Sequence, residues 1–96
     1  MIKHVVCYKL IDNSLEKKQE VKNMLMTMKG KLNYFIDIQV GLDFLGSERS
    51  YDVVLEMTFN TVEDMQAYQK DEYHFNVIKP YMKSVRTGSV SVDYEI

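Results

Sequence analysis

The chain has 96 residues, of which 46% are hydrophobic and 27% are charged, a composition typical of a globular protein and not of a disordered one. We therefore expect a single domain over residues 1–96. The formal net charge is −2 and the basic residues are scattered, so the sequence gives no support to nucleic-acid binding. No segment approaches the roughly 18 apolar residues of a membrane-spanning helix, and the first ten residues show no signal peptide. Cys7 is the only cysteine, which suits a cytoplasmic protein.

The first predicted element is a strand over residues 2–10, IKHVVCYKL. Side chains alternate between the two faces of a strand, so one face carries Ile2, His4, Val6, Tyr8 and Leu10. His4 therefore belongs to the more apolar face. Cys7 belongs to the opposite face, which makes a Cys7–His4 nucleophile pair geometrically poor.

A helix is predicted to follow the first strand, within residues 11–32. Asn13 with Glu16 three residues later is a plausible helix start, with Asn13 as the N-cap. Apolar residues recur at helical spacing and predict one stripe that faces a core: Val21, Met24, Leu25, Met28 and Leu32. Gly30 is predicted to mark the end of the helix.

Two strands and a second helix are predicted next. The strands cover residues 34–44 and 51–59, with a polar turn between them. The helix begins near residue 60, where either Asn60 with Glu63 or Thr61 with Asp64 can form a capping box. Residues 70–73 interrupt the helical period.

The chain then resumes a short helical stretch and ends in a strand. Four apolar residues lie on one side of the helical stretch, and Pro80 limits its regularity: Phe75, Ile78, Met82 and Val85. The last predicted strand covers residues 88–96.

The element order β-α-β-β-α-β predicts an α+β, ferredoxin-like fold, in which both helices cover one face of a four-stranded antiparallel sheet. The other face would carry Val5, Cys7 and Val54 among polar residues. An uncovered sheet face with apolar side chains tends to bind a partner, so we expect a homodimer packed sheet against sheet.

Four segments resemble, in order and over nearly the full chain, the stress-responsive dimeric α/β-barrel (Dabb) family: IKHVVCYKL, RSYDVVLEMTF, AYQKDEYH and SVSVDYEI. The most specific features are the early histidine, the Tyr-Asp pair that opens the third strand, a tyrosine and a histidine six residues apart, and the final Val-Asp-Tyr. The resemblance implies a ferredoxin-like monomer and a homodimer whose two sheets form a barrel with the helices outside.

The resemblance also implies a pocket between sheet and helices. Most members have no established activity, but one plant polyketide cyclase closes a ring by aldol condensation. In that kind of member the pocket is lined by residues that match His4, Tyr68 and His74. Members often have Tyr-x-x-His-Pro-x-His here, whereas this chain has Asp71-Glu72 in place of His-Pro. We therefore expect a more acidic and less rigid turn before His74.

Such a pocket would support acid–base chemistry on a small carbonyl or aromatic compound. A neutral imidazole can take a proton from the carbon beside a carbonyl, and a phenol can donate to the enolate oxygen. If Asp71 or Glu72 approaches His74, the charged imidazolium would be favoured and the pKa would rise.

Two classes of function remain open from the sequence. The first is a protein that binds a small apolar or aromatic molecule without turnover, with His4 and Tyr68 as structural core residues. The second is a cyclase or isomerase that needs no cofactor and uses His74, Tyr68 and His4. No spacing motif supports a metal site at His4 and His74, and a chain of this size leaves little room for haem.

Overall fold

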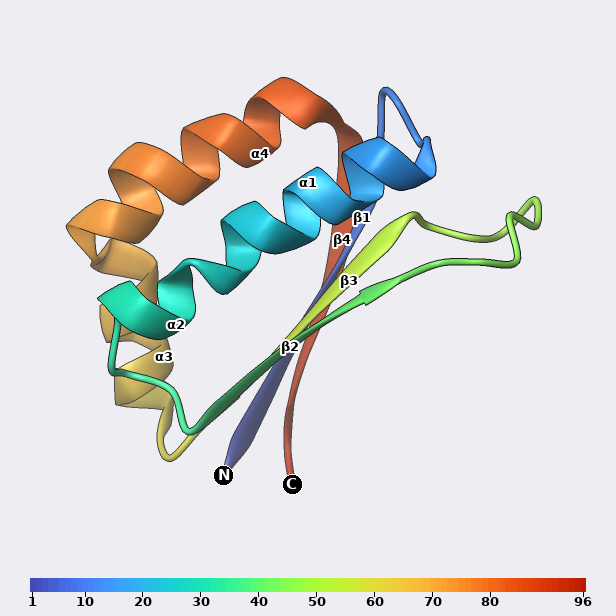
Figure 1. Ribbon diagram of the computed structural model, residues 1–96. Coiled ribbons are helices and arrows are strands. Elements are labelled where there is room, and N and C mark those ends of the chain that lie inside the picture. Colours follow the sequence, from blue (N-terminus) through green and yellow to red (C-terminus); the bar gives the residue numbers. More distant parts are fainter.

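The computed structural model describes residues 1–96 and contains one sheet with helices on one of its faces (Figure 1). In chain order the elements are β1 (Ile2–Leu10), α1 (Leu15–Met26), α2 (Met28–Lys31), β2 (Asp37–Leu42), β3 (Val53–Phe59), α3 (Val62–Lys70), the π-helical turn η1 (His74–Ile78), α4 (Lys79–Val85) and β4 (Arg86–Glu95). The four strands are antiparallel in the order β2-β3-β1-β4. The predicted α+β, ferredoxin-like arrangement is confirmed.

The core lies between the helices and the covered face of the sheet. Alternate residues of the central strands face the helices, among them Leu55 and Phe59 of β3, which are 1% and 0% exposed. They pack with Val21 and Leu25 of α1, which are both fully buried. The helical stripe predicted in the first helix therefore faces this core.

The first helix differs from its prediction at both ends. Ser14, not Asn13, is the N-cap, and its side chain accepts a hydrogen bond from the backbone N–H of Lys17. The helix is interrupted at Thr27, whose hydroxyl donates to the Met24 carbonyl at 2.5 Å. Such a bond to a preceding carbonyl bends a helix. Gly30 lies inside the short α2 and does not end the helix.

The second helix confirms one of its two predicted starts. Thr61 is the N-cap of α3, and its hydroxyl accepts from the backbone N–H of Asp64 at 3.1 Å. The following stretch contradicts the predicted stripe, because Phe75 is 56% exposed while Ile78 and Met82 are buried. The cause is the wide turn η1, in which the Lys79 N–H bonds to the His74 carbonyl, five residues back. This turn changes the angular spacing that an α-helical pattern assumes.

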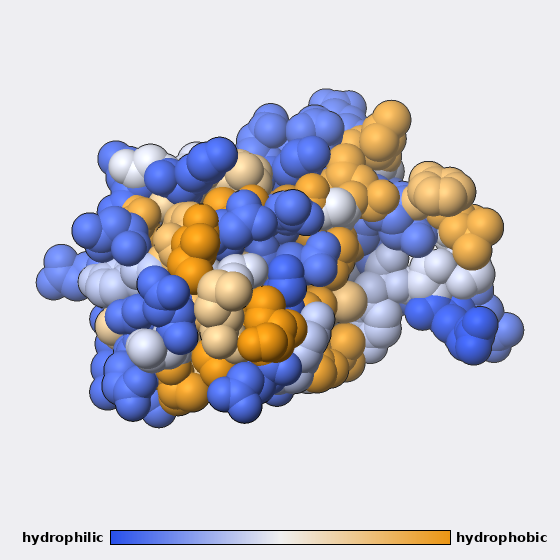
Figure 2. Space-filling model, turned by 90° about the horizontal axis from the view of Figure 1, so that it is seen from below, coloured by the Kyte–Doolittle hydropathy of each residue, from blue (hydrophilic) through white to orange (hydrophobic).

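The uncovered face of the sheet carries more apolar surface than expected. Val92 of β4 lies opposite Val5 of β1, and Val90 lies opposite Cys7, so the four side chains share this face. Val90, Val92 and the nearby Tyr94 are 49%, 62% and 46% exposed. Seen from below, the molecule shows hydrophobic side chains gathered between hydrophilic ones (Figure 2). We call the face formed by Val5, Cys7, Val90, Val92 and Tyr94 the open sheet face.

Asp52 stabilises the junction between β1 and the β2–β3 loop. Its carboxylate accepts from the Leu10 N–H at 2.7 Å, and its own N–H donates to the Tyr8 carbonyl at 2.8 Å. Asp52 is 6% exposed, so its loss leaves the Leu10 N–H without a partner in a buried place. We expect Asp52→Ala to cost about 1–3 kcal/mol of unfolding free energy.

The measurement for Asp52 is a denaturant titration of the wild type, Asp52→Ala and Asp52→Asn. The asparagine variant retains an oxygen that can accept from Leu10 and should recover part of the loss. Equal stability of the wild type and Asp52→Ala would contradict this role.

Candidate functional site

His4 forms a hydrogen-bonded pair with a residue of the adjacent strand. It lies directly opposite Asp93, on the adjacent strand β4, and its Nδ1 is paired with a carboxylate oxygen of Asp93. A carboxylate only accepts hydrogen bonds, so Nδ1 donates and the pair fixes the orientation of the ring. His4 is 7% exposed and Asp93 is on the outer strand. The buried imidazole therefore has a hydrogen-bond partner at Nδ1, and its other ring nitrogen, Nε2, has none within the chain.

Tyr68 connects the two histidines. The ring centroids of His4 and Tyr68 are 6.1 Å apart, and those of Tyr68 and His74 are 4.5 Å apart. Phe59 packs against both His4 and Tyr68, with centroid distances of 6.4 and 5.5 Å. The structure thus brings the three predicted site residues into one aromatic row, which runs from β1 across α3 to η1.

His74 is held in place at the corner between α3 and η1. Asp71 ends α3, and its carboxylate accepts from the Tyr73 N–H at 2.8 Å and from the Tyr34 hydroxyl at 3.0 Å. These bonds hold the turn before His74. The Nδ1 of His74 lies 3.3 Å from the Gln69 carbonyl oxygen. Since a carbonyl only accepts, Nδ1 carries the proton and Nε2 keeps a lone pair in the neutral ring.

The imidazole of His74 is disposed to be neutral. Burial lowers the pKa of His74 below its ordinary value of 6.5, and the hydrogen bond to the Gln69 carbonyl opposes this only in part. Lys79 lowers the pKa further, whereas the contribution of Asp71 in the opposite direction is the smallest. The acidic turn therefore does not turn His74 into an acid, and at neutral pH the group is a base.

The two phenols near this row are disposed to stay protonated. Burial raises the pKa of Tyr68 well above its ordinary value of 10.0, with a contribution from the nearby Tyr8, and burial raises the pKa of Tyr8 to about 12. Neither hydroxyl makes a hydrogen bond within the chain, yet no fully buried side-chain oxygen or nitrogen lacks a partner. The Tyr8 hydroxyl therefore retains accessible surface and is free to donate to a ligand, whereas Tyr68 is only 2% exposed.

His74 lines a cavity of about 180 Å³ between the sheet and the η1–α4 segment. The cavity has an apolar part and a polar part, and its lining residues are Val6, Tyr8, His74, Ile78, Lys79, Met82, Arg86 and Ser89. His4 and Tyr68 are not among them and lie behind His74 in the aromatic row. We call this space the His74 cavity.

Asp93 was singled out in the sequence only as part of the final Val-Asp-Tyr and was given no role, and nothing in the sequence pointed to Arg86 or Ser89. Each belongs to β4, and its neighbours on β1 depend on the register of that pair. The register shifts between Lys9 and Leu10, and a sequence pattern does not show such a shift. The alternation of β4 was the signal in the sequence that could have found two of them, because it places Ser89 and Asp93 on one face of the strand and Val90 on the other.

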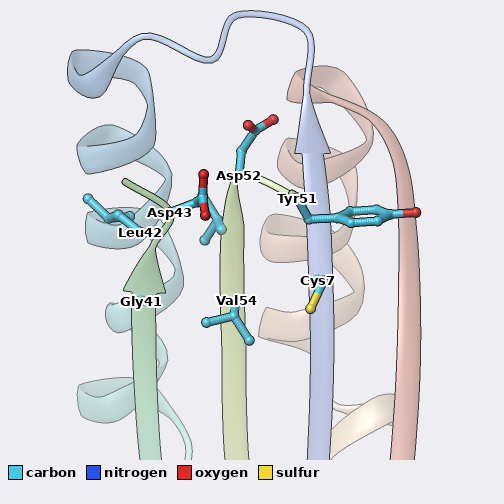
Figure 3. A pocket seen from close by; sticks show the side chains of 8 residues that line it. Cys7, Gly41, Leu42, Asp43, Tyr51, Asp52 and Val54 are labelled. Carbon is cyan, nitrogen blue, oxygen red and sulfur yellow. The ribbon is translucent and has the colours of Figure 1, made fainter. Parts of the chain in front are cut away.

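A larger cavity, of about 230 Å³, lies on the other face of the sheet and contains none of the predicted site residues (Figure 3). Cys7, Gly41 and Val54 line it, and a Cβ on Gly41 would lie 3.0 Å from a methyl of Val54. Its two carboxylates are already used locally, by Asp52 on the Leu10 N–H and by Asp43 on the Gly46 N–H. With no base and with occupied carboxylates, this cavity is suited to packing more than to chemistry.

Comparison with known proteins identifies the family. The sequence matches the Stress responsive A/B Barrel Domain (Dabb) over residues 2–96. The chain belongs to this family. No curated protein matches the sequence. The Dabb domain has no defined function of its own. In the structure, no helix has the length and apolar character that a membrane span requires.

Solved structures share the fold over almost the whole chain. A dimeric protein of unknown function from Bacteroides fragilis is 25% identical, with a TM-score of 0.81, and the alignment covers 99% of this chain and 95% of that one. An Arabidopsis thaliana protein is 19% identical, with a TM-score of 0.85 and coverage of 100% and 95%. A hydroxynitrile lyase from Passiflora edulis is 14% identical, with a TM-score of 0.81 and coverage of 99% and 92%. The last two show the fold alone.

The lowered pKa of His74 has a consequence for stability. Below pH 6.5 the unfolded chain binds a proton at His74 that the folded chain does not yet bind, so acid favours unfolding. We expect wild-type stability to fall more steeply than that of His74→Gln as the pH decreases from 6.5 towards the lower folded-state pKa. Denaturant titrations at several pH values measure this difference. Parallel pH profiles of the two proteins would contradict the lowered pKa.

Proposed function

We propose that this Dabb domain binds a small apolar or aromatic molecule in the His74 cavity. The observation that carries the proposal is the position of the His74 imidazole at the wall of a cavity that also has apolar side chains, and burial lowers the pKa of that imidazole. Val6, Ile78 and Met82 supply the apolar contacts, and the Tyr8 hydroxyl is free to donate. Small-molecule sites usually combine apolar walls with polar groups that orient the ligand.

The size of the His74 cavity limits the ligand. An apolar cavity of about 150 Å³ is enough for benzene, and the His74 cavity has about 180 Å³. A single ring or a short chain therefore fits, with room for one polar substituent. A polycyclic compound does not fit unless the η1–α4 segment moves.

The second candidate is a cyclase or isomerase that needs no cofactor. The observation that favours it is the protonation pattern, with a neutral His74 beside a Tyr68 that stays protonated. In this reaction the Nε2 of His74 takes a proton from the carbon beside a carbonyl. The Tyr68 phenol donates to the enolate oxygen, which requires the substrate to reach past His74, because Tyr68 does not line the cavity. His4, fixed by Asp93, packs edge-on against Tyr68 and positions its ring. The hydroxynitrile lyase supports the view that this fold can carry an active site.

Screening tests both candidates. Small aromatic and β-keto compounds are added to the isotope-labelled protein, and ligands are found by their effect on the His74 and Ile78 signals. Compounds that bind are then tested for turnover with His74→Ala and Tyr68→Phe. Loss of turnover in both variants with retained binding supports the enzyme, and binding without any turnover supports the first candidate. Absence of any effect on these signals contradicts both.

We further propose that the chain acts as one domain in the cytoplasm, as a homodimer through the open sheet face. The exposed Val90, Val92 and Tyr94 support this interface, since apolar side chains on an uncovered sheet are covered by a partner in stable proteins. The similar Bacteroides fragilis protein is described as dimeric. The free Cys7, half-buried on this face, is consistent with a reducing compartment.

A further inference from the structure

The polar part of the His74 cavity is positively charged. Arg86 and Lys79 both line it, and no aspartate or glutamate does. Only His4 and Lys17 are paired with a carboxylate, so no carboxylate of the chain neutralises Arg86 or Lys79. This is unexpected in a chain whose formal net charge is −2.

Arg86 lines the polar part of the cavity together with Tyr8. Its guanidinium is close enough to Tyr8 to oppose the rise in the pKa of that buried phenol. Tyr8 lies directly opposite Ser89 on β4, and Arg86 pairs with Leu10 at the next position of the same face. The guanidinium of Arg86, the Tyr8 hydroxyl and the Ser89 hydroxyl therefore gather on one wall of the cavity.

Lys79 has a different position. Its ammonium lies 5.1 Å from the centre of the exposed Phe75 ring, which keeps it at the entrance. It is suited to attract an anion, whereas the planar guanidinium of Arg86 can bind a carboxylate through two parallel hydrogen bonds.

We propose that the ligand of the His74 cavity is a small carboxylic acid in its anionic form. Arg86 binds the carboxylate, Tyr8 and Ser89 donate further hydrogen bonds, and Lys79 attracts the anion at the entrance. The apolar body of the acid lies on Val6, Ile78 and Met82, where a bare inorganic anion would make no favourable contact. This inference rests on the proposed binding function and specifies the ligand class of the same cavity.

The test compares carboxylates with amides of the same shape. Benzoate, hexanoate, benzamide, hexanamide and inorganic phosphate are titrated into the labelled full chain, and dissociation constants are taken from backbone NMR shifts. Because a hydrogen bond to a charged group contributes more than a neutral one, we expect each carboxylate to bind at least about tenfold more tightly than its amide. Added salt should weaken the carboxylates only.

Variants assign the preference to Arg86. In Arg86→Gln the carboxylate and the amide should bind within about twofold of each other, whereas Arg86→Lys, which retains the charge, should keep part of the preference. Lys83→Gln is the matched control, because Lys83 is a cation on α4, close to Arg86 in the sequence, that does not line the cavity. If Arg86→Gln does not fold, the comparison of carboxylate and amide binding to the wild type and to Arg86→Lys still tests whether Arg86 binds the carboxylate.

The outcomes separate this inference from the proposed function. If the wild type binds acid and amide equally, the proposal of a carboxylate ligand is wrong, and the cavity is a site for neutral ligands. Phosphate that binds as tightly as benzoate overturns the role of the apolar wall. No binding by any probe overturns the inference and the proposed function together.

Discussion

Replacing Val92 by glutamate is expected to convert the protein from a dimer into a monomer. Val92 is 62% exposed and lies opposite Val5, near the middle of the open sheet face. In a two-fold dimer the substitution places two carboxylates in an apolar interface, and a buried, unpaired charge costs several kcal/mol. The covered face of the sheet and its core are not touched, so the monomer should remain folded.

Light scattering at micromolar concentration measures this effect. The mass of the wild type should be twice the chain mass of 11.3 kDa, and Val92→Glu should give 11.3 kDa. Ile11→Glu is the matched control, since Ile11 is 68% exposed but lies outside the sheet, between β1 and α1. That control should remain dimeric. A monomeric wild type, or a dimeric Val92→Glu, would contradict the open sheet face as the interface.

Tyr68→Ala is expected to destabilise the fold by about 3–5 kcal/mol, as truncation of a buried aromatic residue does. Tyr68 is 2% exposed and contacts Phe59 and both histidines, so its loss leaves a cavity at the centre of the aromatic row. For a domain of this size the melting temperature should fall by more than about 12 °C.

Tyr68→Phe separates the ring of Tyr68 from its hydroxyl. The hydroxyl has no partner within the chain, so the phenylalanine variant should be within about 0.5 kcal/mol of the wild type in stability. If the domain is the proposed cyclase or isomerase, the phenylalanine variant should nevertheless lose turnover. Thermal melts of both variants provide the first readout and turnover of a bound compound the second. A Tyr68→Phe protein as unstable as Tyr68→Ala would mean that the hydroxyl has a structural role, and unchanged turnover would remove it from the reaction.

The sequence predicts the layout of this fold well because its strongest signals are local. Alternation in β1 and β3 separates the covered face from the open one, and His4 is buried as that alternation requires. The helix starts were less certain, since neighbouring residues such as Asn13 and Ser14 can both cap a helix and only one has the right backbone conformation. The π-helical turn before Pro80 could not be predicted from an α-helical period.

The candidate site was predictable only in part. His4, Tyr68 and His74 were selected through the family resemblance, and the structure brings them together, but no periodicity implies their 4.5 and 6.1 Å spacings. The missed residues, Asp93 and Arg86, depend on strand register and on a bulge. The direction of the His74 pKa shift also depends on burial, which outweighs the nearby carboxylate that the sequence made conspicuous.

The two faces of the sheet thus have different uses in this account. The open face offers apolar side chains to a second copy, while the covered face holds the aromatic row and the His74 cavity. Interface variants such as Val92→Glu should therefore leave ligand binding at His74 largely intact, unless the cavity changes shape in the monomer.

The most direct test is an NMR pH titration of the two imidazoles, assigned with His74→Gln and repeated with benzoate and benzamide. We predict that His74 titrates below its ordinary value of 6.5 and that its ring signals shift when a ligand is added. Such a result would establish a neutral base inside a ligand site. A His74 that titrates at or above 6.5 and responds to no compound would contradict the account, and the His74 cavity would then be only a gap in the packing.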